Sequence, residues 1–262
     1  MGALQYLESL HQKPLYQVFH NGMHGVSIGS IITSMLAFGF STGEIMKSLD
    51  SIMTITSTIA PVRLENLLKV PSQKGIDDGA QLKRSLIRLF ALKGYEFETL
   101  YIRDALCPLR IYASDITRLK IVAFHPDVPL WDAIRASTSI PFVFIPHTYK
   151  GRVFVDGGLM VDSIMKCLAE SHRHDSLHVY CSRDKGIVDP KTLTFSEYSA
   201  YVMNANYTRE HVEWEQKYPH NICVIRNNRI QALDFEKAKQ QKNELLQQGE
   251  HTMKTFLSSR VL

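Results

Sequence analysis

The stretch Gly25-Val26-Ser27-Ile28-Gly29 decides how this chain of 262 residues is interpreted. The pattern G-x-S-x-G is typical of a nucleophile elbow, a sharp turn between a strand and a helix that exposes a serine. After it, apolar residues recur at helical spacing from Ile31 to Phe38, and before it Tyr16–Phe19 is rich in strand-forming residues. The sequence therefore predicts a strand, an exposed Ser27 and a helix, in that order.

Gly25 and Gly29 are expected to remove side chains where this turn crowds its neighbours. Ser27 would then lie at a helix N-terminus, where free N–H groups and the helix dipole favour a developing oxyanion. The alternative is a glycine-flanked helix cap whose serine simply faces solvent. These five residues alone do not separate the two interpretations.

A second stretch far downstream, Val153–Gly158, carries a carboxylate at the end of a predicted strand. Asp156 follows three strand-forming residues, and Gly157 and Gly158 would let the backbone fold tightly behind it. Taken alone, Asp-Gly-Gly is also typical of a plain turn after an edge strand. Ser27 and Asp156 together indicate a serine acyl hydrolase in which an aspartate, not a histidine, acts as the base.

The composition is that of an ordinary globular protein, with 45% hydrophobic and 21% charged residues. A formal net charge of +4, with no Lys/Arg run of five or more, gives no signal for nucleic-acid binding but is compatible with anionic lipid headgroups. The four cysteines (Cys107, Cys167, Cys181 and Cys223) lack C-x-x-C spacing and are expected to be free thiols. Since no apolar run reaches about 18 residues and no signal-peptide pattern is found, we expect a cytoplasmic protein, at most peripheral to membranes.

Predicted strands and helices alternate along the chain. Strands are expected at 109–113, 120–124, 153–155, 177–181 and 222–225. Helices are expected at 2–10, 82–90, 131–137 and 198–217, and from 234 onward. A further helix is expected after a capping box at 41–44, with an apolar stripe that continues to Leu49, Ile52 and Met53, and Asp77–Asp78 is expected at a helix N-terminus. This alternation favours an α/β fold with a mainly parallel sheet. Because no linker rich in Pro, Gly or Ser interrupts it, we expect a single domain over residues 1–262.

Four separated segments resemble, in order, those of the patatin-like phospholipase family. The segment around Ser27 is similar to the family's serine elbow and the helix that follows. Ala133–Pro141 resembles its Ala-Ser-x-x-x-Pro segment, and Asp156–Leu159 resembles its catalytic Asp-Gly-Gly. Leu233–Phe235, with the residues at 245–249, resembles the closing helix of a subgroup found in large DNA viruses and microbes.

The resemblance implies a three-layer α/β/α fold, with a mainly parallel central sheet, that hydrolyses ester bonds of phospholipids or other lipids. It makes Ser27 the nucleophile and Asp156 the base, with a pKa that burial would have to raise. The residues implied to support the elbow, the oxyanion and the dyad are Gly25, Ile28, Gly29, Gly157 and Gly158. We expect no metal and no cofactor, for reasons of residue spacing given below. The expected partners are a lipid or phospholipid substrate and a membrane surface contacted peripherally, and the oligomeric state is left open.

One part of the family's pattern is not found. The family opens with a strand and a glycine-rich loop whose N–H groups form the oxyanion hole, whereas Gly2–Glu8 resembles the helix after that loop. Asp162 and Ile164 also replace the Asn and Pro that often follow the Asp-Gly-Gly segment. We therefore expect a domain that is N-terminally incomplete, with the N–H of Ile28 and the helix dipole left to stabilise the oxyanion. Loss of one oxyanion donor typically costs ~2.7–4 kcal/mol.

Three functional hypotheses follow. The first is a lipid acyl hydrolase that is weakened, or whose true start lies upstream. The second is a catalytically inactive relative that keeps the fold to bind lipid or protein. The third is a Ser-His-Asp hydrolase with a histidine base, for which the candidates are His172, His211, His220 and His251, none of them within a motif. His172 and His174 are too closely spaced for a metal site on one helical face, and no nucleotide-binding motif is present.

Overall fold

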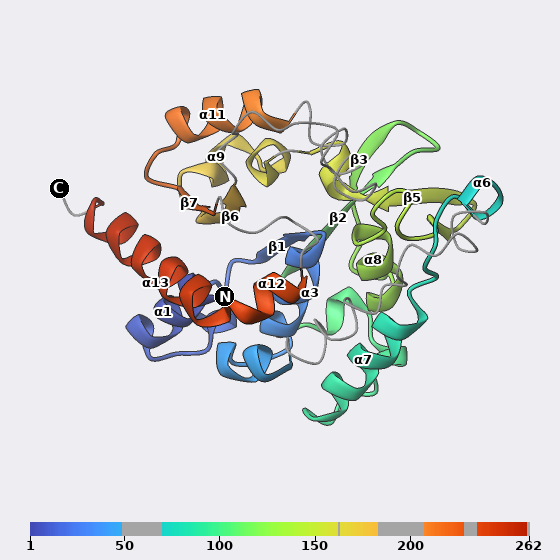
Figure 1. Cartoon of the computed structure of the whole chain (residues 1–262), viewed down its shortest axis with the longest axis horizontal. Helices are drawn as coiled ribbons and strands as arrows, with labels where there is room; N and C mark the ends of the chain where they lie inside the picture. The colour runs from blue at the N-terminus through green and yellow to red at the C-terminus, as the bar shows by residue number, and fades with distance from the viewer. Residues whose placement is uncertain (49–69, 162, 183–206, 228–234, 261–262) are drawn as a thin grey trace. The chain divides into compact units, whose positions relative to one another are not determined.

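The computed structural model describes residues 1–48, 70–161, 163–182, 207–227 and 235–260. The chain divides into two compact units, one formed by His11–Val161 and the other by Met1–Leu10 with Asp162–Leu262. Each unit is described by itself. Figure 1 shows the helices and strands of both.

A five-stranded sheet forms the centre of the unit His11–Val161. Its strands are β1 (Met23–Val26), β2 (Leu109–Asp115), β3 (Lys120–Ala123), β4 (His147–Tyr149) and β5 (Arg152–Asp156). They are ordered β1-β2-β5-β4, and β3 also pairs with β2. β2 therefore lies between the strand that leads into Ser27 and the strand that ends at Asp156, with Tyr112 opposite Val26 and Ala113 opposite Asp156.

The prediction of an α/β fold is confirmed, and the sheet is mixed. β1 and β2 are parallel, whereas the pairs β2–β3, β2–β5 and β4–β5 are antiparallel. Short turns join β2 to β3 and β4 to β5, and such turns connect only antiparallel neighbours. The mainly parallel arrangement expected from the sequence therefore applies to β1–β2, and in the other unit to β6–β7.

Two helices, α3 (Ile28–Ala37) and α8 (Leu130–Ser137), pack on the sheet and on each other. α3 contacts β1 and β2, and α8 contacts β2, β4 and β5, so together they form one helical layer. Their buried apolar residues include Ile31, Met35 and Ile134. Removal of such side chains from water is the main favourable term in folding.

The unit contains further short and long helical elements. They are α2 (Leu15–Val18), α6 (Val70–Gln73), α7 (Ala80–Ala91), η1 (Phe97–Thr99), η2 (Ile102–Asp104) and η3 (Gly157–Leu159). α7 buries Leu82, Leu86, Leu89 and Phe90, the stripe expected from the sequence. Phe90 contacts the rings of Phe38 and Phe97, which adds an aromatic cluster to the core.

The other unit contains α1 (Gly2–His11, of which His11 belongs to the first unit), η4 (Ile164–Cys167), α9 (Glu170–Arg173), β6 (His178–Ser182), α11 (Tyr207–Lys217), β7 (Ile222–Arg226), α12 (Phe235–Gln240) and α13 (Lys242–Ser258). β6 and β7 form a parallel pair. A small core of Met165, Tyr218 and Ile222 supports it. Over the described ranges of the chain, no helix combines the length and apolar character that crossing a bilayer requires.

One predicted strand is wrong. Tyr16–Phe19 lies mostly in the helical turn α2, which follows Pro14, and the strand before the elbow is β1. Proline fixes φ near the helical value and is favoured where a helix starts, whereas the strand-forming side chains gave only a weak preference. Gly22, at φ +137, then allows the chain to turn into β1.

Two predicted helix starts are confirmed. In the capping box, the Glu44 N–H donates to Ser41 Oγ, and the Ser41 N–H donates to the Glu44 carboxylate. The stripe expected after it continues to Leu49, Ile52 and Met53, which lie outside the described residues. Asp77 and Asp78 accept hydrogen bonds from the N–H groups of Gly79 and Ala80 at the start of α7.

Candidate active site

Ser27 occupies a sharp turn between β1 and α3. β1 ends at Val26, α3 begins at Ile28, and Ser27 between them has φ 54° and ψ −133°. A positive φ is uncommon for a residue with a side chain and costs about 1–3 kcal/mol. Three hydrogen bonds hold this conformation. The Ser27 C=O accepts from the Ser30 N–H at 2.9 Å and from Ser30 Oγ at 2.6 Å, and the Ser27 N–H donates to Ser137 Oγ at 2.9 Å.

The two glycines of the elbow have different roles. A Cβ at Gly25 would lie 2.3 Å from Thr33 Oγ1 and 2.5 Å from the Ser30 Cα, so α3 passes too close for any side chain. A Cβ at Gly29 would meet nothing within 4 Å. The crowding predicted for both glycines is therefore found at Gly25, and at Gly29 the prediction is wrong because this residue faces open space.

Asp156 lies at the end of β5 with its carboxylate against the serine. Ser27 Oγ donates a hydrogen bond of 2.5 Å to Asp156 Oδ2, and the Gly158 N–H donates one of 2.8 Å to Oδ1. The Asp156 residue is only 7% exposed. Burial raises the pKa of Asp156 to about 6, although the hydrogen bonds from Ser27 and Gly158 favour the charged form and oppose the increase.

Gly157 and Gly158 allow the chain to turn closely behind this carboxylate. A Cβ at Gly157 would lie 2.8 Å from the Tyr112 carbonyl oxygen and 3.1 Å from a methyl group of Val26. One at Gly158 would lie 3.1 Å from Asp156 Oδ1. Gly157 therefore lets the turn pack onto β2, and Gly158 leaves room for its own N–H to reach the carboxylate.

The backbone N–H groups at the start of α3 are the donors nearest to Ser27 in sequence. The N–H of Ser27 itself is used by Ser137, as described above. The first N–H groups of a helix have no acceptor within the helix, and the dipole places partial positive charge there. Those of Ile28 and Gly29 are therefore the donors that α3 can offer to an anion formed beside Ser27.

The histidine candidates do not contribute to this contact. Ser27 donates directly to Asp156, without an imidazole between them. His172, His220 and His251 are exposed in the other unit, and the side chain of His211 lies outside the described residues. His24, which is not among these candidates, lies in β1 with Nδ1 2.8 Å from the Tyr112 hydroxyl.

Apolar side chains close to the dyad in sequence differ in exposure. Met35, Leu36 and Phe144 are buried and belong to the core. In contrast, Ile28 is 52% exposed and Leu159 39% exposed, although one follows Ser27 directly and the other follows Asp156 by three residues. Large exposed apolar side chains beside a reactive group suit an apolar ligand.

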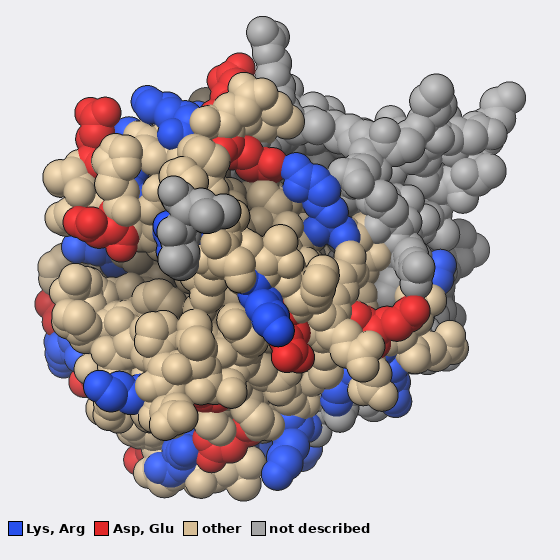
Figure 2. Space-filling view, turned by 90° about the vertical axis from the view of Figure 1, so that its left-hand side faces the viewer, with Lys and Arg blue, Asp and Glu red and all other residues tan. Residues whose placement is uncertain are grey.

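The described residues offer no cluster of three or more His, Cys, Asp or Glu that could hold a metal ion. Charged residues are mixed on the face shown in Figure 2, where Lys and Arg lie near Asp and Glu on a largely uncharged surface. That face therefore presents both signs of charge, as the small net charge of +4 leads one to expect.

Sequence reasoning missed the contribution of α8 to the site. Ser137 Oγ accepts from the Ser27 N–H and donates to the Tyr112 C=O at 2.7 Å, and the Ser139 C=O accepts from the Asp156 N–H at 2.8 Å. From the sequence, the Ala133–Pro141 segment is recognisable only as a motif. Its two serines, two residues apart, were the available signal.

Comparison with known sequences identifies the class to which this fold and site belong. The patatin-like phospholipase family matches residues 1–164, more than half of the chain, and the protein belongs to that family. Its relatives include the uncharacterized protein YqhO of Bacillus subtilis, 21% identical over 89% of this chain and 86% of the relative. The uncharacterized protein R571 of Acanthamoeba polyphaga mimivirus is 23% identical over 88% of this chain and 80% of the relative.

Proposed function

We propose that this protein is a lipid acyl hydrolase that cleaves carboxylic esters with a Ser27–Asp156 dyad. The observation that carries the proposal is the 2.5 Å hydrogen bond from Ser27 Oγ to the buried Asp156 carboxylate. Membership of the patatin-like phospholipase family supports hydrolysis of lipid esters as the general activity. Because both dyad residues are in contact, we favour an enzyme over an inactive binding protein.

The reaction follows from this contact. Ser27 Oγ attacks the acyl carbonyl carbon while Asp156 accepts the hydroxyl proton, which gives a tetrahedral oxyanion. Collapse of this intermediate breaks the ester bond, the alcohol leaves with the proton from Asp156, and the acyl group remains on Ser27. Water then attacks the acyl-enzyme, Asp156 accepts its proton, and Ser27 recovers its hydrogen as the fatty acid leaves. A base with a pKa of about 6 suits both proton transfers near neutral pH.

The helix N-terminus supports the oxyanion in this proposal. The N–H groups of Ile28 and Gly29 lie in the first turn of α3, directly after the nucleophile. Donors fixed in advance at the place where charge develops contribute strongly to acyl transfer. The Ser27 N–H already donates to Ser137 Oγ, so it is not counted among the oxyanion donors.

The first experiment measures hydrolysis of a short-chain p-nitrophenyl ester and of phospholipid micelles by residues 1–262, together with labelling by a fluorophosphonate. We expect hydrolysis and a single covalent label on Ser27. A folded protein that neither hydrolyses these esters nor takes up the label would contradict the enzyme and leave a fold that binds lipid or protein.

The pKa of Asp156 predicts the acidic limb of the pH profile. Below a pH of about 6 the carboxyl is protonated and cannot accept the Ser27 proton. We therefore expect kcat/KM on the p-nitrophenyl ester to fall about tenfold per pH unit well below 6 and to level off above it. A profile that stays flat down to pH 4.5 would show that no group with this pKa acts as the base.

The exposed apolar residues beside the dyad predict a preference for aggregated lipid, and peripheral membrane contact is part of this proposal. We expect Leu159→Ser to raise KM for phospholipid micelles several-fold while leaving kcat on the short p-nitrophenyl ester nearly unchanged. Leu119→Ser is the matched control, because Leu119 is 78% exposed in the turn between β2 and β3, away from the dyad in sequence. Equal effects of both substitutions on micelles would argue against a role of Leu159 in substrate contact.

A further inference from the structure

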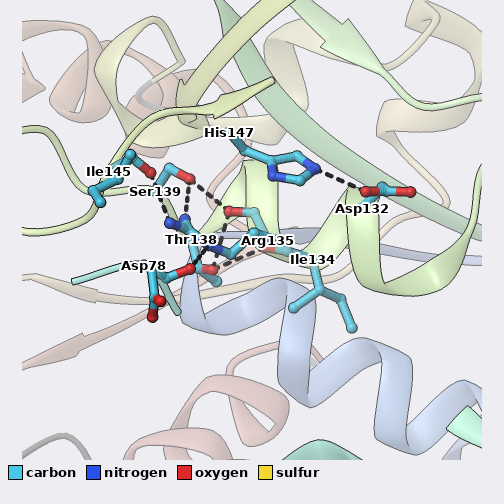
Figure 3. A network of polar contacts seen from close by, with 8 residues as sticks. All are labelled: Asp78, Asp132, Ile134, Arg135, Thr138, Ser139, Ile145 and His147. Atoms are coloured by element: carbon cyan, nitrogen blue, oxygen red, sulfur yellow. Dashed lines mark hydrogen bonds and ion pairs between the residues drawn. The ribbon is translucent and has the colours of Figure 1, made fainter. Parts of the chain in front are cut away.

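The strongest unassigned feature outside the dyad is a buried guanidinium on α8. Arg135 is only 3% exposed, and a buried charge is costly unless several hydrogen bonds satisfy it. Its Nε donates to the Asp78 C=O at 3.1 Å, Nη1 to Ser139 Oγ, and Nη2 to the Ile145 C=O at 2.6 Å. Figure 3 shows the guanidinium among these three acceptors.

The position of Arg135 is confined on its other sides as well. The guanidinium lies 5.2 Å from the centroid of the Phe144 ring, within reach of a cation–π interaction. A Cβ at Gly79 would lie 2.4 Å from Arg135 Nε and 2.8 Å from Cδ. Arg135 therefore links α8 to the turn before α7 and to the segment at 144–145, and a side chain at Gly79 would displace it.

The hydrogen bonds continue from Arg135 to the base. Ser139 Oγ accepts from Arg135 and itself donates to the Arg135 C=O at 2.6 Å, so the residues after α8 are held against the helix end. The Ser139 C=O in turn accepts the Asp156 N–H. This series of contacts joins the guanidinium to the backbone of the residue whose carboxylate receives the Ser27 proton.

The same helix end also holds the nucleophile. Ser137 lies between Arg135 and Ser139 in sequence, is fully buried, and accepts the N–H of Ser27. One short segment is thus bonded to both members of the dyad, through Ser137 to Ser27 and through Ser139 to Asp156. Any shift of this segment would change the distance between Ser27 Oγ and Asp156.

We propose that Arg135 is a positioning residue for the reaction, fixing the end of α8 so that Ser137 and Ser139 hold Ser27 and Asp156 at hydrogen-bond distance. The proposal rests on the dyad function proposed above. Arg135 touches neither reacting group, so its effect is on alignment. A displacement of about 1 Å in a catalytic group can cost about 10²-fold in rate.

Gly79→Ala tests this without altering Arg135 or the dyad. Its new Cβ would push the guanidinium away, and it also introduces a side chain at φ +77. Gly94→Ala is the matched control, because Gly94 has φ +78 and its Cβ would meet nothing within 4 Å. We expect Gly79→Ala to lower kcat and the rate of Ser27 phosphonylation about 10- to 100-fold, with KM changed less than twofold, and Gly94→Ala to leave all three near wild type.

Arg135→Lys provides a second variant if Gly79→Ala does not fold. Lysine keeps a positive charge but cannot reach three acceptors with a planar fork, so we expect the same fall in kcat with KM retained. The positioning role would be overturned if Gly79→Ala, Gly94→Ala and wild type had equal kcat values, or if Gly79→Ala changed KM alone. The proposed dyad would not be affected by either result. A wild-type protein that is not phosphonylated would overturn the dyad, and with it this proposal.

Discussion

Ser27→Ala and Asp156→Asn are each expected to lower kcat/KM for ester hydrolysis at least about 10³-fold. The double variant should be no less active than the less active of the two single variants. Alanine removes the attacking oxygen, and asparagine cannot take the proton that Ser27 loses. The two groups act as one unit through the 2.5 Å hydrogen bond, and effects within such a unit are strongly non-additive. Initial rates on the p-nitrophenyl ester measure the effect, and circular dichroism establishes that each variant is folded.

Stability provides an independent control for Asp156→Asn. The pKa of Asp156 is raised from an ordinary 3.8 to about 6 in the folded protein, so between these values the folded state binds more protons than the unfolded state. The free energy of unfolding therefore falls as pH rises through this window. Once the pH is above about 6, the total loss is about 3 kcal/mol. Asparagine does not ionise, so in Asp156→Asn this part of the free energy of unfolding is not lost as pH rises.

We accordingly expect Asp156→Asn to be more stable than wild type at pH 8 and to lose that advantage at pH 4, as measured by urea unfolding at both values. The combination of lost activity and gained stability distinguishes a functional carboxylate from one that merely supports the fold. An Asp156→Asn variant less stable than wild type at pH 8 would indicate that the carboxylate is not penalised by burial.

The local features of the site could be predicted from sequence, because each depends on neighbours along the chain. The glycine pattern around Ser27 predicted a turn between a strand and a helix, and Asp156 was expected at the end of a strand. The capping box at Ser41 and the acidic start of α7 were confirmed for the same reason. Turns and caps are decided within a few residues, where steric and hydrogen-bonding preferences are strong.

Features that depend on distant partners could not be predicted. Tyr16–Phe19 had strand-forming side chains, but the residues that pair with β2 are Met23–Val26. The hydrogen bond between Ser27 and Ser137 spans 110 positions in sequence, and the Arg135–Asp78 contact spans 57. A charged residue within an amphipathic helix is ordinarily expected at the surface, so nothing in the sequence indicated that Arg135 would be buried.

Gly25→Ala is expected to destabilise the protein by about 1–3 kcal/mol or more and to lower its activity. The new Cβ would lie 2.5 Å from the Ser30 Cα and 2.7 Å from the Gly29 carbonyl oxygen, and backbone atoms cannot move aside as a flexible side chain can. Forced shifts of this kind typically cost 1–3 kcal/mol or more. Because Ser30 also holds the Ser27 C=O, a shift of α3 would change the position of Ser27 relative to Asp156.

Gly29→Ala is the matched control, four residues away in the same motif. Its Cβ would meet nothing within 4 Å, and alanine in a helix is favoured over glycine by roughly 0.5–1 kcal/mol. We expect unchanged or slightly increased stability for Gly29→Ala, measured by urea unfolding beside Gly25→Ala and wild type. If both variants lost stability equally, the close approach of α3 to β1 would not be the reason for glycine at position 25. A large loss at Gly25 alone would show that this glycine is required by the packing of α3, the helix proposed to carry the oxyanion donors.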